Sequence, residues 1–193
     1  HTVKEFYFRG LYDIPKLISG VYWTDLTFSW FGKLHAFWTV LFSKLLGKKA
    51  FVVAGGDDVA NIPSINYGMF SFWWKKWCPL FVFKYADLIL PVSESNLLET
   101  IENTSADPLR VKLLYHGFDY QKWKRMKGVP KEDMVLTVGA VTEETFSKKG
   151  LNLFVKSALC LPDVNFVLVG PWHDSAINRL KEIDSSNVTF TGG

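Results

Sequence analysis

Short apolar runs alternate along this chain with longer segments of helical period, and this alternation restricts the fold more than any other feature. Apolar runs bounded by turn residues are typical of buried strands, and the segments between them are long enough for crossover helices. We predict strands at 26–31, 49–54, 88–92, 110–115, 134–138, 164–169 and 188–190. The pattern favours an α/β fold with parallel sheets.

Apolar residues recur at helical spacing between the predicted strands, so several connections are predicted to be helices. Ser93 is the expected N-cap of one helix, and Gly47 is the expected end of another. The side chains that these helices should bury are Leu34, Phe37, Trp38, Leu41, Phe42 and Leu45 in the first, Leu97, Leu98 and Ile101 in the second, Leu151, Phe154, Val155 and Ala158 in the third, and Ile177, Leu180 and Ile183 in the fourth.

A polar segment with Gly and Pro at 125–132 separates two stretches of apolar patterning, and this composition is typical of a linker. We predict that residues 1–124 are the C-terminal part of one Rossmann-like domain. Residues 133–193 are then the N-terminal part of a second one. Both domains are expected to be incomplete, because three strands do not finish a doubly wound sheet.

Composition argues against several functional classes. The net charge of +3 is dispersed along the chain, so no nucleic-acid partner is expected. The four histidines are isolated and the two cysteines lack metal-ligand spacing, so we expect no metal. The low cysteine count favours a reducing, cytoplasmic location. No apolar run reaches the roughly 18 residues that a membrane-spanning helix needs.

The strand predicted at 134–138 runs into Gly139, and Lys149 and Gly150 stand at the start of the next predicted helix. A strand that ends in Gly lets a ligand approach the backbone, and a Lys beside a helix N-terminus adds a full charge to the unpaired N–H groups. This arrangement is typical of a diphosphate site. Taken alone, it is also compatible with a plain turn at Gly139 and with Lys148 and Lys149 as a solvated helix start.

The order and spacing of several motifs together resemble the retaining glycosyltransferases of family 4, which have the GT-B architecture of two Rossmann-like domains. The matching stretches are ADLILPVS at 86–93, VKLLYHGFD at 111–119, LTVG at 136–139 with the Lys-Gly pair at 149–150, LPDV at 161–164, VLVG at 167–170 and NVTFTG at 187–192. The resemblance implies a nucleoside-diphosphate sugar as the donor substrate, with no cofactor. It also implies a glycan or lipid-linked acceptor, and transfer to an acceptor hydroxyl with retention of the anomeric configuration.

The same resemblance assigns roles to residues on the donor side. Lys149 should contact the donor diphosphate and stabilise the leaving group, which makes it the expected catalytic residue. Lys148 is a neighbouring donor-binding candidate, and Gly139, Gly170 and Gly192 should face the nucleotide. Without the resemblance, simple strand termination would explain Gly170 and Gly192.

On the acceptor side, Asp58 matches a common family Asp, and Asp57 and His35 are further candidates. Adjacent aspartates in a Gly turn are equally expected to accept local backbone N–H groups, and a lone histidine often serves packing or the surface. Two positions depart from the family pattern: Ala140 replaces an Arg, and Gly55 replaces a His. The family's glycine-rich loop and paired glutamates fall outside the matched span, so the chain is expected to be a fragment that is inactive alone.

Two further functional classes compete with glycosyl transfer. A dinucleotide-dependent oxidoreductase is disfavoured, because no Gly-x-Gly-x-x-Gly follows a strand. A non-catalytic or truncated Rossmann-like nucleotide-binding module stays open as an alternative.

Residues 67–85 combine Trp with Lys and suit two interpretations. One is a core helix kinked at Pro79, and the other is an interfacial helix that attaches the protein to the inner face of a membrane. The two differ in where Trp73, Trp74 and Trp77 point.

Overall fold

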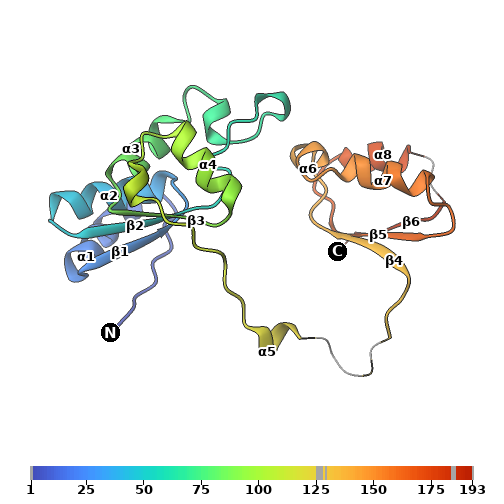
Figure 1. Ribbon diagram of the computed structural model, residues 1–193, viewed down its shortest axis with the longest axis horizontal. Coiled ribbons are helices and arrows are strands. Elements are labelled where there is room, and N and C mark those ends of the chain that lie inside the picture. The colour runs from blue at the N-terminus through green and yellow to red at the C-terminus, as the bar shows by residue number, and fades with distance from the viewer. Residues whose placement is uncertain (1, 125–127, 129, 184–185, 193) are drawn as a thin grey trace. The chain divides into compact units, whose positions relative to one another are not determined.

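Two parallel, three-stranded sheets form the framework of the chain, as the computed structural model shows (Figure 1). The structure describes residues 2–124, 128, 130–183 and 186–192. One sheet belongs to a compact unit of residues 1–119 and the other to a unit of residues 120–193. The predicted α/β fold with two parallel sheets is confirmed. Residues 125–127 and 129 of the predicted linker lie outside the described residues.

The first unit holds β1 (Leu26–Trp30), β2 (Lys49–Ala54) and β3 (Leu88–Pro91), which pair in parallel in that order. Each connection adds the next strand on the same side of the sheet, from β1 to β2 to β3. Because such crossovers are right-handed, the connecting helices lie on one face of the sheet. The helices of this unit are α1 (Ile14–Trp23), α2 (Leu34–Leu45), α3 (Trp77–Tyr85) and α4 (Glu94–Asn103), with short 3-10 turns at Leu11–Asp13, Pro63–Ile65, Met69–Ser71 and Pro108–Arg110.

Helix α2 has the predicted bounds, but the expected buried face is wrong. The fully buried residues are Ala36, Val40 and Ser43, whereas Leu34 and Leu45 are exposed. Small side chains let the helix approach the sheet closely. The larger members of the predicted stripe are only half-buried, and the Phe37 ring packs edge-on against Trp77 of α3.

Helix α4 begins as predicted, since Oγ of Ser93 accepts the backbone N–H of Asn96. Its expected buried face is wrong, because Leu98 and Ile101 are exposed while Asn96 and Thr100 are buried. The Thr100 hydroxyl donates to the Asn96 carbonyl within the helix, which satisfies its polar group.

The segment predicted as a strand at 110–115 forms no regular strand. It leaves the turn at Pro108–Arg110 and follows β3 through two backbone hydrogen bonds. The N–H of Lys112 donates to the Ile89 carbonyl and that of Leu114 donates to the Pro91 carbonyl, both at 2.9 Å. The segment is therefore a partial fourth strand at the edge of the sheet.

Residues 67–85 do not form the single helix of either sequence interpretation. A 3-10 turn at Met69–Ser71 and further turns precede α3, which begins only at Trp77. Pro79 lies in the first turn of α3, where its missing N–H has no intrahelical partner to lose, so the helix needs no kink. Val82 and Phe83 of α3 are fully buried.

The second unit holds β4 (Met134–Val138), β5 (Asn165–Pro171) and β6 (Val188–Gly192), again parallel and in that order. Helices α6 (Glu143–Lys148), α7 (Leu151–Leu159) and α8 (Ala176–Lys181) cover one face of this sheet (Figure 1). Val155, Leu168 and Leu180 are fully buried in their shared core. The unit also contains the short helix α5 (Tyr120–Trp123).

Candidate functional site

Two of the predicted donor-side glycines meet at the carboxyl edge of the second sheet. The N–H of Gly139 donates to the Val169 carbonyl at 2.8 Å, which fixes the end of β4 against β5. Gly170 has a φ of +148°, and a Cβ at this position would overlap the carbonyl oxygen of Gly139. Only glycine fits this close approach, so the backbones of Gly139 and Gly170 lie directly against each other at this edge.

Lys149 folds back over this edge. A Cβ on Gly139 would lie 2.7 Å from Nζ of Lys149 and 3.1 Å from its Cδ. Lys149 follows α6, and Gly150, in the left-handed region at a φ of +63°, is the N-cap of α7. No carboxylate within the described ranges forms an ion pair with Lys149. Its ammonium group is thus placed beside Gly139, close in sequence to a helix N-terminus.

Lys148, the second cation that the sequence indicates, has a different orientation. Its Nζ pairs with Glu144 on the preceding turn of α6 at 3.3 Å. The other acidic residue of that turn, Glu143, pairs with Arg179 at 2.6 Å. These pairs offset the negative charge of the first turn of α6, so the loop after β4 does not repel an anion strongly.

The loops after β4 and β5 are joined to each other. The N–H of Val141 donates to the Pro171 carbonyl at 2.9 Å, and the N–H of Glu143 donates to Asp174 at 2.9 Å. The backbone N–H groups of Glu143 and Ala176 hold the pKa of Asp174 below its ordinary value. The edge that carries Gly139 is therefore held in one conformation by both loops.

Sequence reasoning missed helix α6, which places Lys149. Thr142 caps this helix: its Oγ1 accepts the N–H of Thr145, and Oγ1 of Thr145 accepts the N–H of Thr142. The usual capping box has Glu or Gln at the third helical position, and Thr stands there instead. The signal that could have found the helix is Thr142 followed directly by two acids, Glu143 and Glu144.

Gly192 does not lie against Gly139, Gly170 or Lys149 as these residues lie against one another. Its φ is +76°, and a Cβ on it would lie 3.4 Å from the ring of Trp172. The neighbour of Gly192 is thus an indole at the end of β5. The structure brings together Gly139, Gly170 and Lys149.

In the first unit, Asp58 joins the loops that follow β1 and β2. Its carboxylate accepts the N–H groups of Gly32 at 2.6 Å, Gly55 at 3.0 Å and Gly56 at 3.1 Å. The residue is fully buried. Burial raises the pKa of Asp58, while these backbone N–H groups oppose the rise. We interpret Asp58 as a positioning residue, because it has no exposed surface to offer an acceptor.

The other two acceptor-side candidates lie near Asp58. Asp57 keeps 41% of its side chain exposed and pairs with Lys33 at 2.8 Å. Nε2 of His35 lies 2.5 Å from the Trp30 carbonyl oxygen, and burial lowers the pKa of His35. Of the two aspartates, Asp57 has the carboxylate that is more accessible to a ligand.

The ring of Phe31, a residue that sequence reasoning did not select, covers Gly55. A Cβ on Gly55 would overlap this ring, and Phe31 itself has a φ of +67°. The glycine that departs from the family pattern is therefore required by the aromatic residue above it. A histidine at position 55 would displace Phe31.

Across the described part of the chain, no three His, Cys, Asp or Glu side chains gather closely enough to hold a metal ion.

Comparison with known proteins identifies the fold. No family model matches the chain, and no curated protein matches it. Among solved structures, Alr3699/HepE from Anabaena, in complex with UDP, is 16% identical and has a TM-score of 0.71, over 93% of this chain and 51% of that one. A glycosyltransferase from Rickettsia africae is 16% identical with a TM-score of 0.62, over 100% and 54%. A putative UDP-N-acetylglucosamine 2-epimerase from Listeria monocytogenes is 10% identical with a TM-score of 0.53, over 97% and 54%.

These similarities define the class of protein by its architecture. The chain has the GT-B fold of paired Rossmann-like domains, and it spans about half the length of these three structures. That fold carries more than one activity, since both a glycosyltransferase and a putative epimerase share it.

Proposed function

We propose that this chain takes part in transferring a sugar from a nucleoside-diphosphate sugar to an acceptor hydroxyl. The observation that carries the proposal is the position of Lys149 over Gly139, at the carboxyl edge of a parallel sheet. Nucleotides bind at this edge in open α/β sheets, and a cation close to the N-terminus of α7 suits a diphosphate. The UDP bound to the similar Anabaena protein supports the same class of ligand.

In the proposed reaction, the bond between the anomeric carbon and the diphosphate oxygen breaks, the acceptor oxygen bonds to that carbon, and the hydroxyl proton is released together with the nucleoside diphosphate. Negative charge develops on the leaving diphosphate. The ammonium group of Lys149 and the free N–H groups at the start of α7 would stabilise that charge. Loss of one preorganised donor of this kind raises a barrier by about 2.7–4 kcal/mol. Retention of the anomeric configuration belongs to the proposal through the family resemblance.

On the acceptor side, we assign Asp57 the contact with acceptor hydroxyls of a glycan or lipid-linked molecule. It lies at the carboxyl end of β2, and its carboxylate is the most exposed of the candidates there. Asp58 orients this loop through its three backbone hydrogen bonds. The chemistry occurs in the cytoplasm and needs no metal or cofactor in this proposal.

Thermal unfolding with UDP or GDP tests whether the donor site is competent. At a ligand concentration of about 100 times Kd, binding stabilises the native state by about 2.7 kcal/mol. That gain raises the melting temperature of a unit this small by about 10 °C or more. Absence of a shift with both nucleotides would instead support the alternative, a Rossmann-like module without a working donor site.

A further inference from the structure

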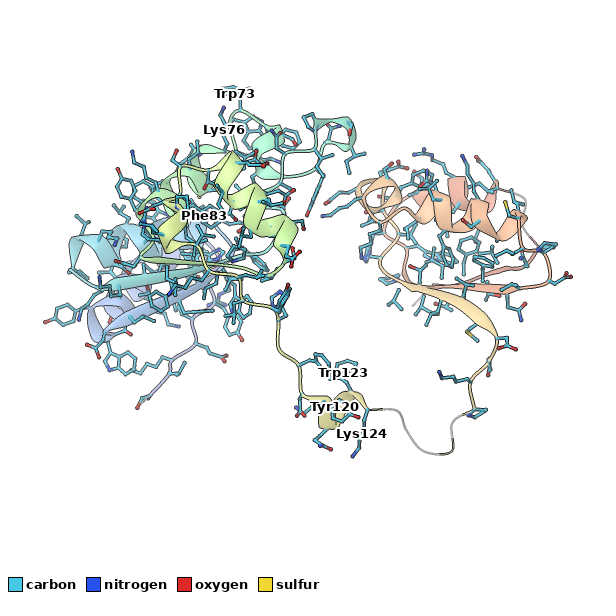
Figure 2. All side chains as sticks on the ribbon, in the orientation of Figure 1. Trp73, Lys76, Phe83, Tyr120, Trp123 and Lys124 are labelled. Atoms are coloured by element: carbon cyan, nitrogen blue, oxygen red, sulfur yellow. The ribbon has the colours of Figure 1, made fainter. Side chains whose placement is uncertain are left out.

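Three exposed tryptophans lie at the start of α3 and in the turns just before it. Trp73 is 83% exposed, Trp74 55% and Trp77 51%. Together with Lys75 and Lys76 they form the continuous sequence WWKKW, which we call the Trp-Lys surface. Figure 2 shows Trp73 and Lys76 at the outer end of the unit, away from Phe83 in the core. Exposed apolar side chains that gather in one patch often mark an interaction site.

The charge around this surface has one sign. Residues 59–86 contain Lys75, Lys76 and Lys84 but no Asp or Glu. The acids that flank this stretch are buried or paired: Asp58 is fully buried, and Asp87 pairs with lysines at 2.7 and 3.2 Å. Neither Lys75 nor Lys76 forms an ion pair within the described part of the chain, so both charges can meet an anionic partner.

Backbone hydrogen bonds and ring packing on both sides of the Trp-Lys surface hold it in place. The N–H of Met69 donates to the Asp57 carbonyl at 2.7 Å, and that of Phe70 donates to the Ala60 carbonyl at 3.2 Å. At its other end the Trp77 ring packs edge-on against Phe37, with centroids 5.1 Å apart. The exposed tryptophans thus project from an anchored base, which lowers the entropy lost on binding.

The ammonium group of Lys75 lies over two aromatic rings, an arrangement that suits an interface. The group is 4.1 Å from the ring centroid of Phe72 and 4.9 Å from that of Trp74. Such cation–π contacts strengthen when they are desolvated. Tryptophan and lysine together are enriched at the boundary between lipid headgroups and acyl chains.

We infer that the Trp-Lys surface binds the headgroup region of an anionic lipid membrane. The tryptophan rings enter the boundary region, and Lys75 and Lys76 contact the lipid phosphates. The attachment is peripheral: among the described residues, no helix is long and apolar enough to cross a bilayer. This inference does not depend on the proposed transfer activity.

Cosedimentation of the chain with vesicles tests the inference. The probes are vesicles of phosphatidylcholine and phosphatidylglycerol in equal parts, and vesicles of phosphatidylcholine alone. We expect binding to the anionic vesicles, and a partition coefficient at least about tenfold lower for the Lys75→Glu/Lys76→Glu variant, since each lysine near such a surface contributes substantially. The matched control is Lys112→Glu/Lys156→Glu, which changes the net charge equally at two exposed sites and should bind like the unchanged chain.

A Trp73→Ser/Trp74→Ser variant separates lipid insertion from charge attraction. These exposed side chains contribute little to folding, so circular dichroism should show an unchanged fold while vesicle binding falls. The inference is overturned if the unchanged chain does not bind, if the control variant loses binding equally, or if phosphatidylcholine alone binds as well. It is also overturned if the tryptophan variant changes only the oligomeric state in size-exclusion chromatography, because the surface would then bind a second copy.

Discussion

Asp58 and Lys149, which lie at the two sheet edges, differ in how many hydrogen bonds and ion pairs their charged groups make. Asp58 is buried and accepts three backbone N–H groups. Lys149 is exposed and has no carboxylate partner within the described ranges. A buried charge whose bonds are all made holds loops together. An exposed cation that has no carboxylate partner among the described residues and lies beside Gly139 is instead available to a ligand.

Asp58 should give the stability of the first unit a distinct pH dependence. Its pKa in the folded chain lies above the ordinary 3.8, so folding favours the protonated carboxyl. The stability from Asp58 is full below pH 3.8 and is lost as the pH rises through the folded pKa, at a slope of up to about 1.4 kcal/mol per pH unit. Urea unfolding at a series of pH values measures this loss.

An Asp58→Asn variant is the control for this effect. The amide has the shape of a protonated carboxyl but does not titrate, so the stability difference between the unchanged chain and the variant should shrink or reverse as the pH rises above 3.8. Asp87 does not confuse the result. Its pKa is lowered, so its contribution is lost only as the pH falls below the ordinary value. Parallel pH profiles for the two proteins would contradict the assignment.

Residue types near the donor edge were predictable, because Gly139 and Lys149 belong to a local motif of a strand, a loop and a helix start. The role of Asp58 was less predictable. One of its hydrogen-bond donors, Gly32, lies 26 residues away in sequence, and such a contact depends on the tertiary fold. The covering of Gly55 by Phe31 is of the same kind, because it joins the ends of two different strands.

At the scale of single elements, apolar periodicity located helices better than it located their buried faces. Strand β1 shows why. Its alternating residues place Thr27 and Ser29 on the buried side, where Thr27 hydrogen-bonds Ser43 of α2, and leave Phe28 and Trp30 exposed. Periodicity separates two faces, but it does not say which face a neighbour covers. That choice depends on packing between elements.

Helix α4 offers a test of this distinction. Leu98 was predicted to be buried but is 56% exposed, whereas Leu151 of α7 is 1% exposed. Leu98→Ala should change the free energy of unfolding by no more than about 0.5 kcal/mol, and Leu151→Ala should lower it by about 2–5 kcal/mol through the cavity that it leaves. Chemical denaturation of both variants measures the difference. Equal losses would mean that α4 packs through the face predicted from sequence.

At the scale of the whole chain, both sheets have helices on one face, a consequence of adding strands in one direction. In the second sheet, the face without helices leaves apolar side chains uncovered. In the edge strand β4, Leu136 is 54% and Val138 68% exposed. Alternate residues of a strand point to the same face, so these two side chains form one apolar surface. An exposed apolar strand at a sheet edge favours association.

We therefore predict that the chain binds a hydrophobic dye and tends to aggregate. Leu136→Thr/Val138→Thr should lower the dye fluorescence clearly. A matched double change, Leu109→Thr/Leu159→Thr, removes leucines that are 87% and 52% exposed but belong to different units, and it should have little effect. Equal dye binding by all three proteins would show that β4 is not the surface responsible.

Calorimetric titration shows whether Lys149, beside Gly139, recognises a diphosphate. The unchanged chain and its Lys149→Ala variant are titrated with UDP and GDP and with the matching monophosphates. The control is Lys148→Ala, which removes the neighbouring cation and keeps Lys149. We predict that Lys149→Ala weakens diphosphate binding by about ten- to hundredfold, the loss of one charged hydrogen bond, and changes monophosphate binding much less. Lys148→Ala should alter neither. Diphosphate binding that survives Lys149→Ala unchanged, or an equal loss for both classes of nucleotide, would mean that Lys149 does not recognise the diphosphate.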